Sequence, residues 1–130
     1  MSLPLKPAQI GAETTWTGVV SFGEDACALG PAGEASCWGN NENGQLGVGD
    51  TASRSTATAA MTASKFAALA VGRNHACGID TAGALLCSGR NANGQLGTLN
   101  TTPSTVFAPI VTTGKPYAGL TWKSVAAGDD

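Results

Sequence analysis

Short apolar runs that end close to a glycine recur along the chain and predict β-strands. Few positions follow a helical period, and the runs are separated by glycine turns. Short strands at a spacing of about 8–12 residues with such turns indicate an all-β fold. The predicted strands are Val19–Phe22, Ala26–Leu29, Ala35–Trp38, Leu69–Val71, Ala76–Ile79 and Leu85–Ser88.

One alanine-rich stretch, Ala57–Leu69, leaves a helix open as an alternative. Serine and threonine interrupt it, and the corresponding later stretch carries Pro103, Pro109 and Pro116, which oppose a helix. We therefore expect strands and turns here as well.

The chain contains an internal repeat with an offset of fifty residues. Residues 26–47 align with 76–97 without a gap, and 12 of the 22 positions are identical. The most conspicuous match ends the repeat: Gly44-Gln45-Leu46-Gly47 returns as Gly94-Gln95-Leu96-Gly97. We interpret these eight residues as a structural framework motif, because Asn-Gly pairs precede the glutamines and favour tight turns.

The repeat divides the chain into four segments. We expect an N-terminal extension, native or introduced by cloning, over residues 1–15, then repeats over 16–65 and 66–121. Residues 122–130 look like the opening strand of a third repeat, because Trp122–Gly128 echoes Phe66–Gly72. A unit of about fifty residues suits one propeller blade of four short strands.

Composition excludes several classes of protein. Charged residues make up only 12% of the chain and the net charge is −2, so there is no basic footprint for nucleic acid. No apolar run approaches the ~20 residues that span a bilayer, and no signal peptide stands at the N-terminus. We expect neither membrane insertion by this segment nor nucleic-acid binding.

These residues resemble the regulator of chromosome condensation repeat. Its pattern includes Gly-x-x-His and Trp-Gly-x-Asn-x-x-Gly-Gln-Leu-Gly, matched here by Gly72–His75, Trp38–Gly47 and Gly89–Gly97. The resemblance implies a β-propeller, commonly of seven blades. Two blades cannot close a wheel, so we expect a fragment of a larger propeller, or a chain that covers its open edges by forming a homo-oligomer.

Two positions depart from that family pattern. Asp25 stands where the first copy should have histidine, and Ser88 stands where the second copy should have tryptophan. Neither departure threatens the predicted fold.

Four cysteines form two symmetric pairs. Cys27 and Cys37 flank Ala32 by five residues on either side, and Cys77 and Cys87 flank Ala82 in the same way. In hairpins centred on these turns each pair would face across two strands, which predicts disulfides 27–37 and 77–87. Free buried thiols and a zinc site are the alternatives, and the spacing argues against zinc.

Disulfides indicate an oxidising compartment, so we expect a secreted or ectodomain protein, with a cytosolic or nuclear location as the alternative. The sequon that begins at Asn100 makes that residue a candidate for N-glycosylation. Cysteine-bearing repeats of this kind also resemble secreted and ectodomain members of the family.

Candidate chemistry is sparse. No nucleophile or base accompanies His75, so we predict no catalytic residues, no metal site and no cofactor. Recognition is instead expected in polar residues that follow strand-ending glycines and would share one rim of a propeller. These candidate partner-binding residues are Glu24, Asp25, Arg73, Asn74, Asp129 and Asp130.

The sequence therefore predicts a non-enzymatic module that binds an unidentified protein partner through rim loops. Guanine-nucleotide exchange on a small GTPase, the best-known activity of the family, is one alternative. Glycan binding of the lectin type is another.

Overall fold

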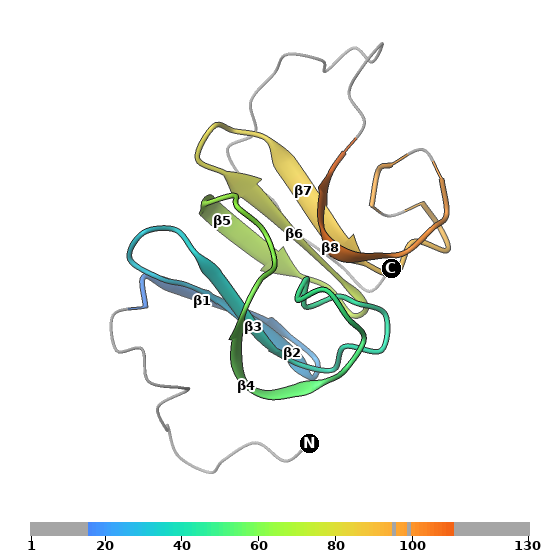
Figure 1. Cartoon of the computed structure of the whole chain (residues 1–130), viewed down its shortest axis with the longest axis horizontal. Coiled ribbons are helices and arrows are strands. Elements are labelled where there is room, and N and C mark those ends of the chain that lie inside the picture. The colour runs from blue at the N-terminus through green and yellow to red at the C-terminus, as the bar shows by residue number, and fades with distance from the viewer. Residues whose placement is uncertain (1–15, 95, 99, 111–130) are drawn as a thin grey trace.

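The computed structural model describes residues 16–94, 96–98 and 100–110, which form two four-stranded antiparallel sheets (Figure 1). Within each sheet the strands lie in chain order, so each sheet is a simple meander. The all-β prediction is confirmed. The first sheet holds β1 (Gly18–Phe22), β2 (Asp25–Leu29), β3 (Ala35–Gly39) and β4 (Arg54–Ala59); the second holds β5 (Phe66–Val71), β6 (His75–Asp80), β7 (Leu85–Gly89) and β8 (Ser104–Pro109).

Each central hairpin carries a disulfide between directly opposed residues. Cys27 pairs with Cys37 in the β2–β3 register and Cys77 with Cys87 in the β6–β7 register. The sulfur atoms lie 2.08 Å apart in both pairs, and the chain has no free cysteine. The turn of the first hairpin needs Gly33, whose φ of 87° lies in the left-handed region that disfavours other residues.

The stretch from residue 57 to 69 contains no helix. It holds the end of β4, a link, and the start of β5 at Phe66. β4 and its counterpart β8 are outer edge strands, and each meets its neighbour with a register shift, between Cys37 and Gly39 in the first sheet. Edge strands need no regular apolar alternation, which is why this region carries no clear strand pattern.

The main core lies between the two sheets. Cys27, Cys37 and Leu46 of the first repeat pack with side chains of the second, including Leu69 and Val71. The rings of Phe66 and Phe107 close the core with centroids 5.2 Å apart and a tilt of 55°. Burying each large apolar side chain contributes about 1.5–3 kcal/mol, so the sheets hold together mainly by this shared core.

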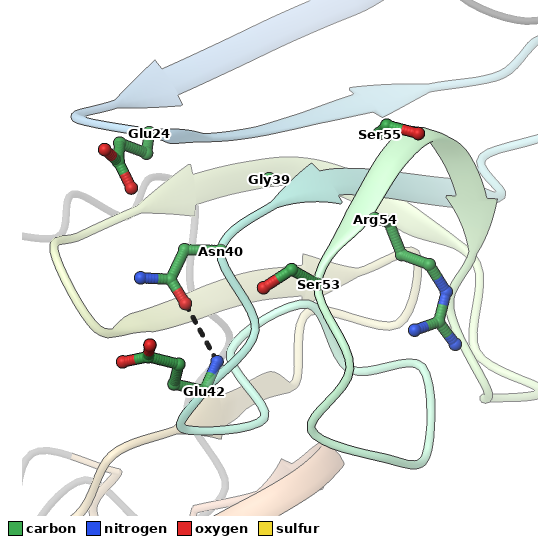
Figure 2. Close-up of a pocket in the computed structure, with 7 residues that line it drawn as sticks. All are labelled: Glu24, Gly39, Asn40, Glu42, Ser53, Arg54 and Ser55. Atoms are coloured by element: carbon green, nitrogen blue, oxygen red, sulfur yellow. Dashed lines mark hydrogen bonds between the residues drawn. The ribbon is translucent and has the colours of Figure 1, made fainter. Parts of the chain in front are cut away.

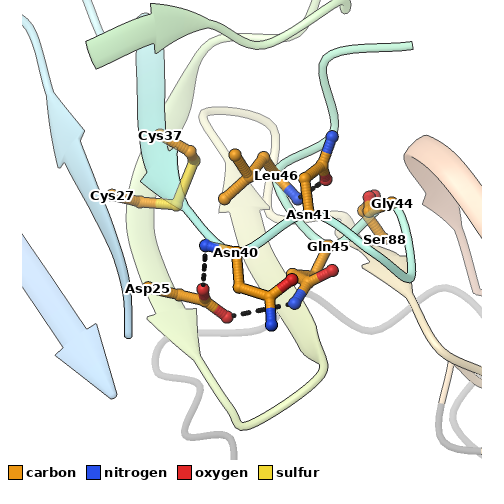
Figure 3. The surroundings of a disulfide bond; sticks show 9 residues. All are labelled: Asp25, Cys27, Cys37, Asn40, Asn41, Gly44, Gln45, Leu46 and Ser88. Atoms are coloured by element: carbon orange, nitrogen blue, oxygen red, sulfur yellow. Dashed lines mark hydrogen bonds between the residues drawn. A yellow bond between two sulfur atoms is a disulfide. The ribbon is translucent and has the colours of Figure 1, made fainter. Parts of the chain in front are cut away.

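Two loops follow β3 and β7 and carry the Gly-Gln-Leu-Gly motifs; we call them the first motif loop (residues 41–47) and the second motif loop (residues 91–97). The fully buried Asn41 organises the first loop (Figure 3). Its Oδ1 accepts from the Leu46 amide at 3.0 Å, and its Nδ2 donates to the carbonyl oxygens of Asp50 and Ala52 at 2.8 and 3.0 Å. One amide side chain thus closes a loop of about ten residues.

Some expectations fall outside the described residues. They concern the extension 1–15, the third repeat over 122–130 with Asp129 and Asp130, and Gln95. In the described part of the chain no helix is long and apolar enough to cross a membrane.

Candidate functional site

Polar loops gather at one end of the two sheets, and we call this end the rim. The β1–β2 turn and the exit from β3 share it because β2 runs antiparallel to both neighbouring strands. The β5–β6 link brings the corresponding turn of the second sheet to the same place. The rim comprises residues 22–25, 39–42, 53–55 and 73–74.

A hollow of about 580 Å³ lies between the rim turns of the two repeats. Four of the six candidate partner-binding residues predicted from the sequence line it, so the structure brings them together across the two sheets. The lining residues are Phe22, Gly23, Glu24, Asp25, Asn40, Arg73 and Asn74.

A second hollow of about 390 Å³ adjoins the first and shares Glu24 and Asn40 with it. Figure 2 shows Glu24 and Glu42 on either side of Asn40, whose Oδ1 accepts from the Glu42 amide at 2.9 Å. The lining residues are Glu24, Gly39, Asn40, Glu42, Ser53, Arg54 and Ser55.

Sequence reasoning missed most of this second hollow. A signal was present, because the strand that ends at Gly39 must leave the sheet at the same end as the turn at Gly23. The residues after Gly39 could therefore have been placed on the rim from the hairpin order alone.

Asp25 lines the first hollow but is itself buried, with 3% of its surface exposed. Its Oδ1 accepts from the Asn40 amide at 2.8 Å, and its Oδ2 accepts from Gln45 Nε2 at 3.2 Å (Figure 3). Burial raises the pKa of this carboxyl to about 6, and the hydrogen bonds from Gln45 and Asn40 oppose that rise. Asp25 therefore positions the rim loops more than it offers a surface to a partner.

Gly39 allows the β3 exit to pass close to the β1–β2 turn. A Cβ at this position would lie 2.9 Å from the Asp25 Cα, and the φ of 114° also disfavours any side chain. The rim depends on this close approach, because it seats Asn40 above Asp25.

An ion pair fixes the far wall of the second hollow. Arg54 Nη2 lies 2.9 Å from Asp50 Oδ2, and its hydrogen bond lowers the pKa of the Asp50 carboxyl. The same carboxylate accepts from the Ala52 amide at 3.0 Å, so the start of β4 is tied to the loop before it.

Family models match the chain in two overlapping segments. Residues 33–79 match a regulator of chromosome condensation (RCC1) repeat, and residues 66–95 match a second model of the same repeat. The chain belongs to the RCC1 repeat family.

Solved structures with this fold confirm that the two sheets are propeller blades of the RCC1 type. Human WBSCR16 matches with a TM-score of 0.76 and 19% identity over 95% of this chain and 31% of that protein. The structure of Kap60 bound to yeast RCC1 (Prp20) contains a chain that matches with a TM-score of 0.69 and 21% identity. The match covers 88% of this chain and 28% of that chain.

Prp20p from Saccharomyces cerevisiae, described with its binding properties to Gsp1p and histones, matches with a TM-score of 0.72 and 15% identity. That match covers 95% of this chain and 30% of Prp20p. The chain thus spans about a third of the length of these relatives. No curated protein sequence matches it.

The other residues singled out in the sequence, His75 and the motif glutamine Gln45, lie in structural surroundings. His75 begins β6, is buried, and faces Gly89 across the sheet. Gln45 Oε1 accepts from the Asn43 amide at 3.0 Å, so the motif glutamine holds its own turn as well as Asp25. Within the described ranges, no group of three or more His, Cys, Asp or Glu side chains could hold a metal ion.

Asn41 and Asn91 are the residues whose role the sequence reasoning missed. Both are identical between the repeats and fully buried. Their identity in the two copies was the available signal, because a buried amide must have its hydrogen bonds satisfied by the loop around it.

Proposed function

We propose that this RCC1-repeat chain is a non-enzymatic protein-interaction module that binds its partner through the rim. The observation that carries the proposal is the convergence of Glu24, Arg73 and Asn74, from two different sheets, around one hollow. Polar loops that are held by a rigid β-scaffold are common binding surfaces. Protein binding is also known for a protein with the same fold, because a solved structure shows Kap60 bound to Prp20.

The chemistry of the rim favours a polar partner segment. Glu24 and Glu42 bring carboxylates, Arg73 and Arg54 bring guanidinium groups, and Asn40 lies between the two acidic residues. A partner surface that carries both charge signs would be complementary to these groups, whereas an apolar surface would not.

The experiment is a capture assay with the full chain and rim variants. We expect Glu24→Lys with Asn74→Lys to abolish retention of a protein that wild type retains. Thr51→Lys is the matched control, because Thr51 is exposed in the loop before β4 and outside the rim. A partner retained equally by all three proteins would refute rim binding, and hits confined to a glycan array would support the lectin-type alternative.

Guanine-nucleotide exchange on a small GTPase is the second candidate, favoured by the similarity to Prp20p, whose binding to Gsp1p has been described. It requires a cytosolic or nuclear protein, which the two hairpin disulfides do not favour. Accelerated release of labelled GDP from a small GTPase, lost in the rim variant, would establish exchange activity.

We further propose an extracellular or ectodomain location. Both cysteine pairs lie at disulfide distance, and Asn100 is exposed. Asn100 Oδ1 accepts from the Thr102 amide at 3.0 Å and from Thr98 Oγ1 at 3.1 Å, so a glycan on its nitrogen would leave these bonds in place.

Two measurements on protein from its native source test this location. Thiol titration after denaturation should find no reactive thiols, and a glycosidase should reduce the mass of wild type but not of Asn100→Gln. Four reactive thiols would contradict the extracellular proposal and favour exchange activity inside the cell.

A further inference from the structure

The glycines of the two motif loops have the same conformation. Gly44 and Gly47 have φ values of 76° and 69°, and Gly94 and Gly97 have 71° and 70°. Asn91 repeats the role of Asn41, accepting from the Leu96 amide at 2.9 Å and donating to the carbonyls of residues 100 and 102. The described residues of the second loop are therefore held by the same asparagine contacts as those of the first.

The first motif loop is covered by the second sheet. Ser88 Oγ donates to the Gly44 carbonyl at 2.6 Å, and the Gly49 amide donates to the Thr105 carbonyl at 2.9 Å. A Cβ on Gly44 would lie 2.9 Å from the Thr105 Cα, and one on Gly47 would lie 2.5 Å from the Phe107 ring. The glycines of this loop are needed because a neighbouring blade lies directly against them.

The second motif loop lacks this cover among the described residues. Ala92, Asn93 and Gly94 are exposed, and a Cβ on Gly94 would meet no described atom within 4 Å. Beside the loop, a small apolar cluster of Cys77, Cys87, Leu96, Leu85 and Ile110 lies on the face of the second sheet that points away from the first.

The outer face of the first sheet has side chains that are more exposed than their counterparts in the second sheet. Val19 is 61% exposed, whereas its repeat counterpart Leu69 is 8% exposed in the core between the sheets. Trp38 is half-buried, whereas its counterpart Ser88 is fully buried against the first motif loop. In the second sheet, the equivalent face contacts the first motif loop. The first sheet therefore has a matching face that could contact a motif loop in the same way.

We propose that the second motif loop of one molecule packs on the outer face of the first sheet of a second copy, head to tail. The contact continues the interface already present between the two sheets. Trp38 of that second copy would take the place of Ser88 and give its indole N–H to the Gly94 carbonyl. Because the two surfaces differ, the contact is heterologous and leads to a ring or an open chain.

This inference does not depend on rim binding, and analytical ultracentrifugation of the full chain tests it. Wild type should exceed its single-chain mass of 12.9 kDa with rising concentration. Gly94→Asn should stay at the single-chain mass, because asparagine tolerates positive φ and its side chain would collide with the incoming sheet. Val19→Lys should do the same from the opposite face.

Mixing the two variants gives the sharpest readout. Each retains one intact surface, so a head-to-tail contact predicts a 1:1 complex in the mixture and none in either variant alone. A symmetric contact predicts no complex in the mixture, which would overturn the proposal, as would a wild-type mass of one chain at every concentration.

Two controls separate assembly from folding. Ala63→Lys adds the same charge in the exposed link between the sheets and should assemble like wild type. Gly44→Asn, at the covered loop, should lower the melting temperature by more than Gly94→Asn does. Equal losses at both glycines would contradict the difference in cover on which the inference rests.

Discussion

At the scale of single residues, Asp25 is a buried acidic side chain whose pKa is raised. It stands where the family pattern has histidine, and the structure buries it beneath the rim with Gln45 and Asn40 as donors. The sequence placed Asp25 on the rim, but the contact with Gln45 joins residues twenty positions apart, and no local pattern encodes it.

The titration of Asp25 gives a pH prediction. Burial raises its pKa from 3.8 to about 6, so the folded state binds a proton between these values that the unfolded state does not. Its contribution to stability is therefore fully present below about pH 4 and is lost as pH rises through about 6.

Asp25→Asn loses one of the two acceptor contacts at every pH, but its stability relative to wild type should be about 1–2 kcal/mol higher at pH 7 than at pH 5, because only the wild-type carboxyl ionises between these values. Denaturant unfolding of both proteins at the two pH values measures the difference. Other carboxylates change the unfolding free energy of both proteins equally with pH, so the difference between the proteins reports on Asp25. A stability difference of the same size at both pH values would show that Asp25 does not ionise between them.

Asn41 gives a second prediction at this scale. Asn41→Ala removes one acceptor and two strong donor contacts inside a fully buried loop, so we expect a loss of about 2–4 kcal/mol of unfolding free energy. Glu42→Ala, next to it but exposed, should change stability by less than about 0.5 kcal/mol. Similar losses in both variants would argue against the buried amide as the organiser of the loop.

At the scale of elements, the hairpins were the most predictable part of the molecule. The glycine turns, the alternating apolar residues and the cysteine spacing all point to β2–β3 and β6–β7, because their information is local. β4 and β8 had no such signal, since they are edge strands in which only Phe107 is buried and the other residues are half-buried or exposed without alternation. The β4 side of the second hollow, residues 53–55, was missed for the same reason.

The hairpin disulfides give the prediction at this scale. Replacing Cys27 and Cys37 together by alanine should lower the unfolding free energy by about 2–3 kcal/mol, the value for a loop of about ten residues. The same change at Cys77 and Cys87 is the matched test in the second sheet. Calorimetry that shows no loss in either double variant would mean that strand pairing alone fixes the hairpins.

At the scale of the whole molecule, the sequence predicted the repeated blades but not how the two blades contact each other. Duplication of the Gly-Gln-Leu-Gly motif predicted two similar blades, and the structure has them. That the first motif loop lies against β7 and β8 of the next blade did not follow from the sequence, because Ser88 and Thr105 contact it only through the packing of the two sheets. The motif belongs as much to the contact between blades as to its own blade.

The rim depends on that same packing. Glu24 and Arg73 approach one hollow because the two sheets pack face to face and align their strand ends. The proposed interaction function therefore requires both blades, and neither sheet alone carries the complete surface.

Hydrogen–deuterium exchange of the full chain with and without its captured protein partner is the most direct test of rim binding. We predict that the partner slows exchange at residues 22–25, 39–42 and 73–74 together, with no comparable change in the hairpin turns at 31–33 and 81–83. Protection confined to those hairpin turns, with the rim unchanged, would contradict the proposed function.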